Sequence, residues 1–118
     1  MSHNIESLMI FWIQEIVGEE WTVSGDKPKD QTQFVLVDRT GGPRESMVMD
    51  RAEILIEVYH KTSRAAASAM ADIIADSIPE LLETESITRA RVNSVVNLDD
   101  VLAQYHRYQI YVDVSNRR

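Results

Sequence analysis

The feature that most constrains this fold is a change of hydrophobic period just after residue 60. Apolar side chains alternate with mixed ones from Glu53 to Tyr59, which is the two-residue period of a β-strand. From Thr62 onward the apolar residues recur at helical spacing, and alanine is frequent among them. Because alanines keep a helix thin, such a helix can lie close on a sheet. The sequence therefore predicts a strand over residues 53–60 that leads directly into a sheet-packed helix.

This helix is predicted over residues 63–82. Thr62 or Ser63 suits its N-cap, because a hydroxyl oxygen there can accept a hydrogen bond from an N–H of the first turn. Pro79 should end or kink the helix one or two residues earlier, since proline lacks the N–H and disfavours a helical residue before it.

The remaining elements follow from the same two periods. The sequence predicts a helix over 4–17, strands over 34–40, 87–96 and 105–114, and mostly loop over 18–33, where Trp21–Val23 is a candidate for a short strand. This order predicts an α+β fold: a four-stranded, mostly antiparallel sheet with two helices packed on one face. Because 118 residues is about the modal size of one domain, residues 1–118 are expected to form a single domain.

The charge balance and the lack of cysteine exclude several classes of protein. Lys and Arg number 12 against 19 for Asp and Glu, and a formal net charge of -7 disfavours a broad nucleic-acid-binding face. With no cysteine there can be no disulfide and no cysteine-based zinc site. The apolar run from Leu8 to Ile13 is too short to span a bilayer, so we expect a soluble protein without an export signal or a membrane partner.

No residue pattern indicates catalysis or metal binding. The histidines lie on different predicted elements and outside any HxxxH spacing, and His60 and His106 are interpreted as strand-end residues that are candidates for cross-strand neighbours. Asp72 and Asp76 share one helix face, which is typical of a solvated surface. There is no nucleophile-elbow motif and no glycine-rich phosphate loop. We expect no enzyme activity, no cofactor and no metal.

Two segments carry more apolar or charged surface than one core contact needs. The connection from Gly41 to Ala52 is twelve residues long and contains apolar side chains, and a long loop of this kind usually contacts something. The arginines around it form either a clamp for acidic groups or an ordinary charged loop. In the first helix, Ile10, Phe11 and Val17 fall outside the apolar stripe, which indicates a second contact surface.

The residues that begin and follow this loop resemble a known family. Arg39-Thr-Gly-Gly-Pro-Arg44, then Asp50-Arg51 leading into Ile54–Tyr59, then Thr62-Ser-Arg-Ala65 opening an alanine-rich helix, resemble the tail-terminator proteins of long-tailed bacteriophages and prophages. Arg107-Tyr-Gln-Ile-Tyr-Val-Asp-Val114 is similar to their closing strand. The resemblance covers about residues 34–114, and the predicted first helix fits the N-terminal helix of the family. Residues 97–105 lack the proline-rich turn that is common there.

The resemblance implies a structural virion protein of the head-to-tail junction, assembled in the host cytoplasm. Such proteins form a ring, usually of six subunits, on the last ring of the tail-tube protein, stop its polymerisation and offer their upper surface to the head-completion or connector protein. DNA passes through the channel without specific binding. A different class stays open: a small α+β regulatory or ligand-binding module of ferredoxin-like type that acts as a dimer. An acid/base hydrolase using Asp72 or Asp76 would need a deep cleft beside its helix.

Within this interpretation two sets of residues are candidates for contacts. The subunit or tube interface is assigned to Ile10, Phe11, Val17, Arg39, Gly41, Gly42, Arg44, Met47, Met49 and Arg51. The acidic residues assigned to the channel are Asp99 and Asp100, because negative charge would let DNA slide without adhering.

We expect Arg44→Glu to leave the monomer folded and to abolish tail termination, because the loop contact loses its positive charge. Tail lengths in particles assembled with the variant measure the effect, and circular dichroism controls for folding. Tails of wild-type length would refute the assignment of this loop.

Overall fold

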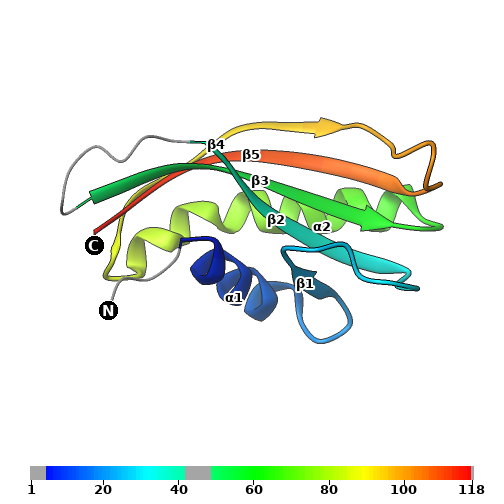
Figure 1. The fold of residues 1–118 in the computed structure, drawn as a ribbon, viewed down its shortest axis with the longest axis horizontal. Helices are drawn as coiled ribbons and strands as arrows, with labels where there is room; N and C mark the ends of the chain where they lie inside the picture. Colours follow the sequence, from blue (N-terminus) through cyan, green and yellow to red (C-terminus); the bar gives the residue numbers. More distant parts are fainter. Residues whose placement is uncertain (1–4, 42–48, 118) are drawn as a thin grey trace.

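The computed structural model describes residues 5–41 and 49–117, and in this part of the chain its centre is a five-stranded sheet (Figure 1). The strand order is β1-β2-β3-β5-β4; β1 pairs with β2 in parallel, and the other neighbours pair antiparallel. The strands are β1 (Thr22–Ser24), β2 (Gln33–Gly41), β3 (Met49–His60), β4 (Ile87–Asn97) and β5 (His106–Arg117). The helices are α1 (Ile5–Val17), α2 (Arg64–Ser77) and the 3-10 helix η1 (Ile78–Glu83).

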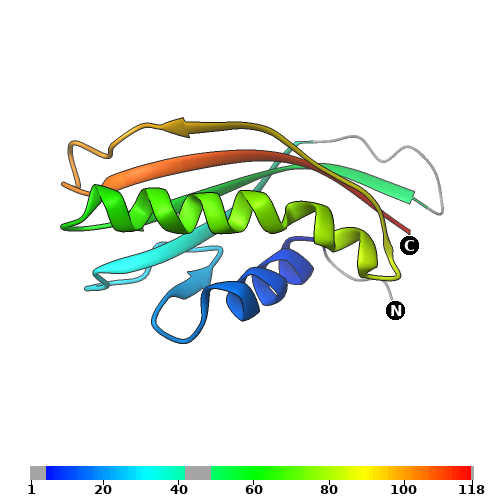
Figure 2. The same ribbon diagram turned by 180° about the vertical axis from the view of Figure 1, so that it is seen from behind.

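Both α-helices pack on the same face of the sheet, as predicted, and the opposite face carries no helix of the described chain (Figures 1 and 2). The predicted order of the longer elements is confirmed. The sheet has five described strands rather than four, because residues 22–24 form β1 beside β2. A strand of three residues is too short to show a period in the sequence, and it depends on tertiary contacts.

The second helix begins at the predicted N-cap and changes from α-helix to 3-10 helix near the proline, as the sequence indicates. Ser63 is the N-cap, and its Oγ accepts a hydrogen bond from the backbone N–H of Ala66 at 3.0 Å. The α-helical part ends at Ser77, and the chain continues as η1 with Pro79 in its first turn. The predicted helix 63–82 is therefore two helices of different pitch, joined at the proline.

The core lies between the helices and the sheet. Ala67 and Ala71 are fully buried, so small side chains let α2 approach β3 and β5 closely. The residues of the core with no more than 1% of their surface exposed include Met9, Ile13, Val35, Val37, Ala52, Ile54, Ile56, Val58, Ile74, Ile78, Leu81, Ile110, Val112 and Val114. The central strands β3 and β5 supply seven of these, so the sheet is most apolar at its middle.

The buried stripe of α1 differs from the predicted one at its end. Its buried residues are Ile5, Met9, Ile13 and Val17, a strict four-residue spacing. Val17 was expected to lie outside the stripe and to help bury a ring contact, but it is 8% exposed and belongs to the core. Val17 is therefore not available as an interface residue in this fold.

We expect Ile74→Ala to lower the free energy of unfolding by about 2–5 kcal/mol, because it removes fully buried methyl groups and leaves a cavity. Ile73→Ala on the same helix is the matched control, since Ile73 is 48% exposed and should change stability by no more than about 0.5–1 kcal/mol. Chemical denaturation measures both. Equal losses would contradict the assigned face of α2.

Candidate interaction site: the open face and the edges of the sheet

Polar side chains cover the middle of the sheet face that the helices leave open. Arg107 Nη1 lies 3.4 Å from Glu57 Oε2 and donates to Tyr59 Oη at 3.3 Å. Gln109 Nε2 donates to the same Glu57 oxygen at 2.9 Å, and Tyr111 Oη donates to Gln109 Oε1 at 3.2 Å. Burial raises the pKa of the Tyr59 phenol, so this group stays neutral and accepts the Arg107 hydrogen bond. The polar side chains of this face therefore bond to one another across the neighbouring strands β3 and β5.

An aromatic cluster closes one end of the open face. The ring of Phe34 stacks on Tyr59 with centroids 4.6 Å apart, and the edge of Tyr105 meets both rings at 5.4 and 5.8 Å. Lys27 Nζ lies 5.3 Å from the Tyr105 centroid, and Tyr105 Oη donates to the backbone oxygen of Gln31 at 2.7 Å. These contacts hold the 25–32 loop and the 98–105 turn together over the end of the sheet.

Asp99, one of the two predicted channel residues, is held inside its own chain. Asn97 Nδ2 donates to Asp99 Oδ1 at 3.0 Å, the Arg107 backbone N–H donates to the same oxygen at 3.3 Å, and Arg64 Nη2 donates to Oδ2 at 2.9 Å. These hydrogen bonds, that of Asn97 foremost, lower the pKa of Asp99 to about 2. Asp99 therefore links the turn to the first residue of α2.

Asp100, the other predicted channel residue, shapes the turn. Its backbone forms an isolated β-bridge with Tyr105, and its Oδ1 accepts a hydrogen bond from the Ala103 backbone N–H at 3.1 Å. Lys27 Nζ lies 3.9 Å from the other carboxylate oxygen. Since both aspartates face cations of their own chain, the turn presents less net negative charge than two free carboxylates.

The two described histidines are cross-strand neighbours, as the sequence indicated. His60 of β3 is paired with His106 of β5 in the register. His60 Nδ1 accepts hydrogen bonds from the backbone N–H groups of Thr62 and Ser63 at 3.2 and 3.0 Å. Burial, with a smaller contribution from His106, lowers the pKa of His60, so the imidazole is held neutral at the start of α2. No group of three or more metal-ligating side chains occurs among residues 5–41 and 49–117.

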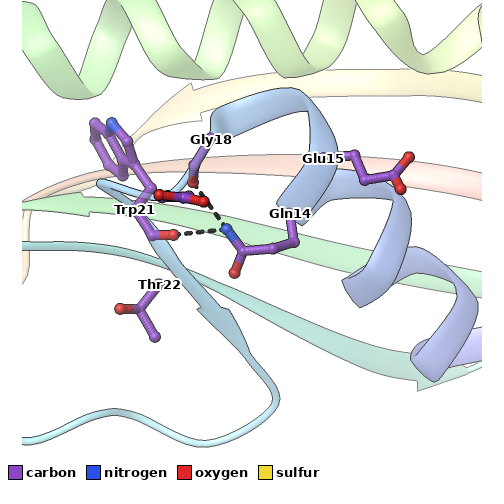
Figure 3. Close-up of a pocket in the computed structure, with 6 residues that line it drawn as sticks. Gln14, Glu15, Gly18, Trp21 and Thr22 are labelled. Atoms are coloured by element: carbon purple, nitrogen blue, oxygen red, sulfur yellow. Dashed lines mark hydrogen bonds between the residues drawn. The ribbon is translucent and has the colours of Figure 1, made fainter.

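An open hollow of about 460 Å³ lies beside the end of α1 (Figure 3). Its lining residues are Gln14, Glu15, Gly18, Glu19, Trp21 and Thr22. Gln14 Nε2 donates to the backbone oxygens of Gly18 at 2.8 Å and Trp21 at 2.9 Å, and Gln14 Oε1 accepts from the Val23 N–H at 3.2 Å. The side-chain amide of Gln14 is thus used in hydrogen bonds to nearby backbone groups. The charged groups that line the hollow are Glu15 and Glu19.

The described members of the predicted interface set lie on α1 and at the ends of β2 and β3 that face their connection. Phe11 is 68% exposed on α1, whereas Ile10 is half-buried against the core. Arg39 donates to the backbone oxygens of Gly41 at 3.4 Å and Arg51 at 3.2 Å, so it ties β2 to β3 at the base of their connection. Gly42, Arg44 and Met47, which were predicted as interface residues, and the side chain of Met49 lie outside the described part of the chain.

The sequence did not single out the network around Glu57 and Arg107 or the cluster around Phe34 and Tyr105. The one available signal was the alternation itself, which placed Glu57 and Tyr59 together on the mixed face of a strand. Which residues of the neighbouring strand meet them depends on the register.

Comparison with solved structures finds proteins of similar fold. No family model matches the chain, and no curated protein is significantly similar to it. Among solved structures, a chain of the "Virion of native gene transfer agent (GTA) particle" superposes with a TM-score of 0.64 at 13% sequence identity. The match covers 90% of this chain and 84% of that one. The two share a fold. No helix in the described ranges is long and apolar enough to cross a membrane.

The neutral state of His60 predicts a pH dependence of stability. Its folded-state pKa lies below the ordinary value of 6.5, so the unfolded chain binds the proton first and the free energy of unfolding falls as pH drops below about 6.5. We expect His60→Asn, which keeps an acceptor for the two N–H groups, to flatten this slope in denaturation experiments between about pH 7 and pH 5. His106→Asn is the control and should retain most of the slope. An unchanged slope in His60→Asn would contradict this origin.

Proposed function

We propose that this chain is a structural subunit of a phage-like particle and acts as a tail terminator: a ring that ends the tail tube and receives the head connector. The observation that carries the proposal is the fold shared with a chain of a gene transfer agent virion over 90% of this chain. The sequence resemblance of residues 34–114 to tail terminators supports the finer assignment. The role is one of contact and needs no bond-making chemistry or cofactor.

The two ends of the sheet suit two different partners. The 98–105 turn at one end has apolar side chains at its tip, with Leu102 99% exposed and Val101 81% exposed. Gly41 at the end of β2 and Met49 at the start of β3 lie at the other end, because β3 and β5 run antiparallel. Exposed apolar side chains at a loop tip favour a protein partner. In the proposed ring one end meets the tail-tube protein and the other the head-completion protein.

The charge of the subunit suits a channel for DNA. Each copy contributes a formal charge of -7, and a ring multiplies that charge around its lumen, which disfavours adhesion of the passing duplex. The proposal keeps Asp99 and Asp100 on the channel side, where Arg64 and Lys27 offset part of their charge and the other acidic residues of the chain supply the rest. A ligand-binding dimer remains the alternative, but the amide of the hollow beside α1 is already bonded to its own backbone.

The proposal is tested on the purified protein by light scattering after gel filtration, by negative-stain imaging, and by adding it to polymerising tail-tube protein. We expect rings, about six subunits in size as in the resembling family, that cap tube ends and shorten the tubes. A stable dimer that binds no tube end would overturn the proposal in favour of the ligand-binding module.

We further expect Val101→Asp/Leu102→Asp to reduce binding to tube or connector, because the exposed apolar tip becomes charged. Ile73→Asp is the matched control, since Ile73 is 48% exposed but lies within α2 rather than at the turn. Co-sedimentation with the two partners measures the effect. Equal binding by both variants would remove the turn from the contact.

A further inference from the structure

The two edges of the sheet differ in charge, and we propose that they bind one another between copies of this chain. In this arrangement Arg89 and Arg91 on β4 of one copy dock against Glu15 and Glu19 at the α1–β1 hollow of the next. The inference deepens the proposed function, on which it rests, because it names the surfaces through which the ring closes.

The basic edge is strand β4. Residues 87–97 contain Arg89 and Arg91 and no acidic residue. Ala90 and Val92 pack against the core, so the two arginines project from the opposite face of the strand, and both are exposed. Asp113 lies opposite Arg91 in the register, yet neither arginine makes an ion pair with any residue in the described ranges.

The acidic edge is formed by α1, β1 and the residues that join them. Residues 5–26 contain five carboxylates and no lysine or arginine: Glu6, Glu15, Glu19, Glu20 and Asp26. Glu15 and Glu19 line the hollow beside Trp21 and are exposed. Across the part of the chain that the structure describes, these two carboxylates have no cation within ion-pair distance.

The two edges match in hydrogen-bonding geometry as well as in the sign of their charge. A guanidinium group binds carboxylates through two parallel hydrogen bonds. The hollow offers two carboxylates and is about 460 Å³ in volume, which leaves room for a guanidinium group. Apolar surface lies on the same elements as the charges: Phe11, one helical turn before Glu15, is 68% exposed, and Val96, farther along β4, is 41% exposed. Apolar contacts flanked by ion pairs are typical of protein interfaces.

Side chains rather than backbone would make this contact. On the acidic side Gln14 bonds the Trp21 carbonyl and the Val23 N–H, so two backbone groups at the outer edge of β1 already have a partner. On the basic side the register of β4 shifts twice, between Ile87 and Arg89 and again between Val92 and Ser94. Bulges and charges on an edge strand oppose continuous strand pairing. A second copy is therefore met by the arginines and not by a sixth strand.

The position of the edges decides the symmetry. Strands β1 and β4 are the first and last of the sheet, so the acidic and basic surfaces lie on opposite sides of the molecule (Figure 1). One pair of copies cannot join both sets of edges at once. Each contact therefore leaves one acidic and one basic edge for further copies, and such a head-to-tail contact closes into a ring when its rotation divides a full turn.

Charge reversal tests the proposed contact between the two edges, because reversing both edges should restore the association that reversing one edge removes. We expect Arg89→Glu/Arg91→Glu and, separately, Glu15→Arg/Glu19→Arg to weaken self-association in sedimentation velocity by about tenfold or more, because like charges then face each other. An equimolar mixture of the two variants should associate again, since every contact in an alternating assembly is attractive. The chain with all four changes should also associate. Asp72→Arg/Asp76→Arg on exposed α2 positions is the matched control and should behave as the wild type.

Cross-linking tests the same contact even where association is weak. The chain has no cysteine, so Glu15→Cys/Arg91→Cys places the only two thiols on the opposing edges. Mild oxidation should give a ladder of disulfide-linked oligomers on a non-reducing gel. Asp72→Cys/Arg91→Cys is the control and should give dimers through random collisions without a ladder. The absence of a ladder from the first variant overturns the proposal.

The outcomes separate this inference from the proposed function. If the charge-reversed variants still form rings and the cysteine variant gives no disulfide-linked oligomers, the edge pairing is wrong and the tail-terminator proposal remains in place. Charge-dependent chains that never close into rings or cap a tube support the edge pairing and overturn the tail terminator.

Discussion

The structure depends on the burial of one face of the central strands beneath α2. Ile54, Ile56 and Val58 of β3 are covered because the fully buried Ala67 and Ala71 let the helix approach them. With both helices on that face, the opposite face has no helical cover from the described chain. Its polar groups are satisfied across strands instead, through the contacts of Glu57 and Arg107. One-sided packing thus leaves a face and two edges available for other proteins.

The sequence predicted those parts of the fold that show a period. Strand β3, helix α2 and strand β5 each contain enough alternation or helical spacing to identify them, and the pairing of His60 with His106 followed from two strand ends. The three residues of β1 show no period, and they are held by β2 and by the amide of Gln14. Val17 was misplaced because the buried stripe of α1 keeps a four-residue spacing to its last turn. Helix ends are where such patterns are least certain.

The candidate surfaces were harder to predict, because they depend on strand order and register. A net charge of -7 describes the chain as acidic, but it hides a basic edge strand with no acidic residue. Only the order of the sheet places β4 and the acidic α1–β1 region on opposite sides. In the same way, the partners of Glu57 became known only when β5 was aligned with β3. Composition constrains the class of partner, and topology decides where that partner can bind.

The tie between Asp99 and Arg64 has a mechanical consequence. The 98–105 turn is fastened to the first residue of α2 by a 2.9 Å ion pair, and its base is fastened to β5 by the Arg107 backbone. A displacement of the turn would therefore pull on the start of the helix through this ion pair. With 14 residues, α2 is a rod about 21 Å long that runs beneath the sheet toward η1. The helix α2 thus connects the end of the sheet that carries the 98–105 turn with the end that carries η1.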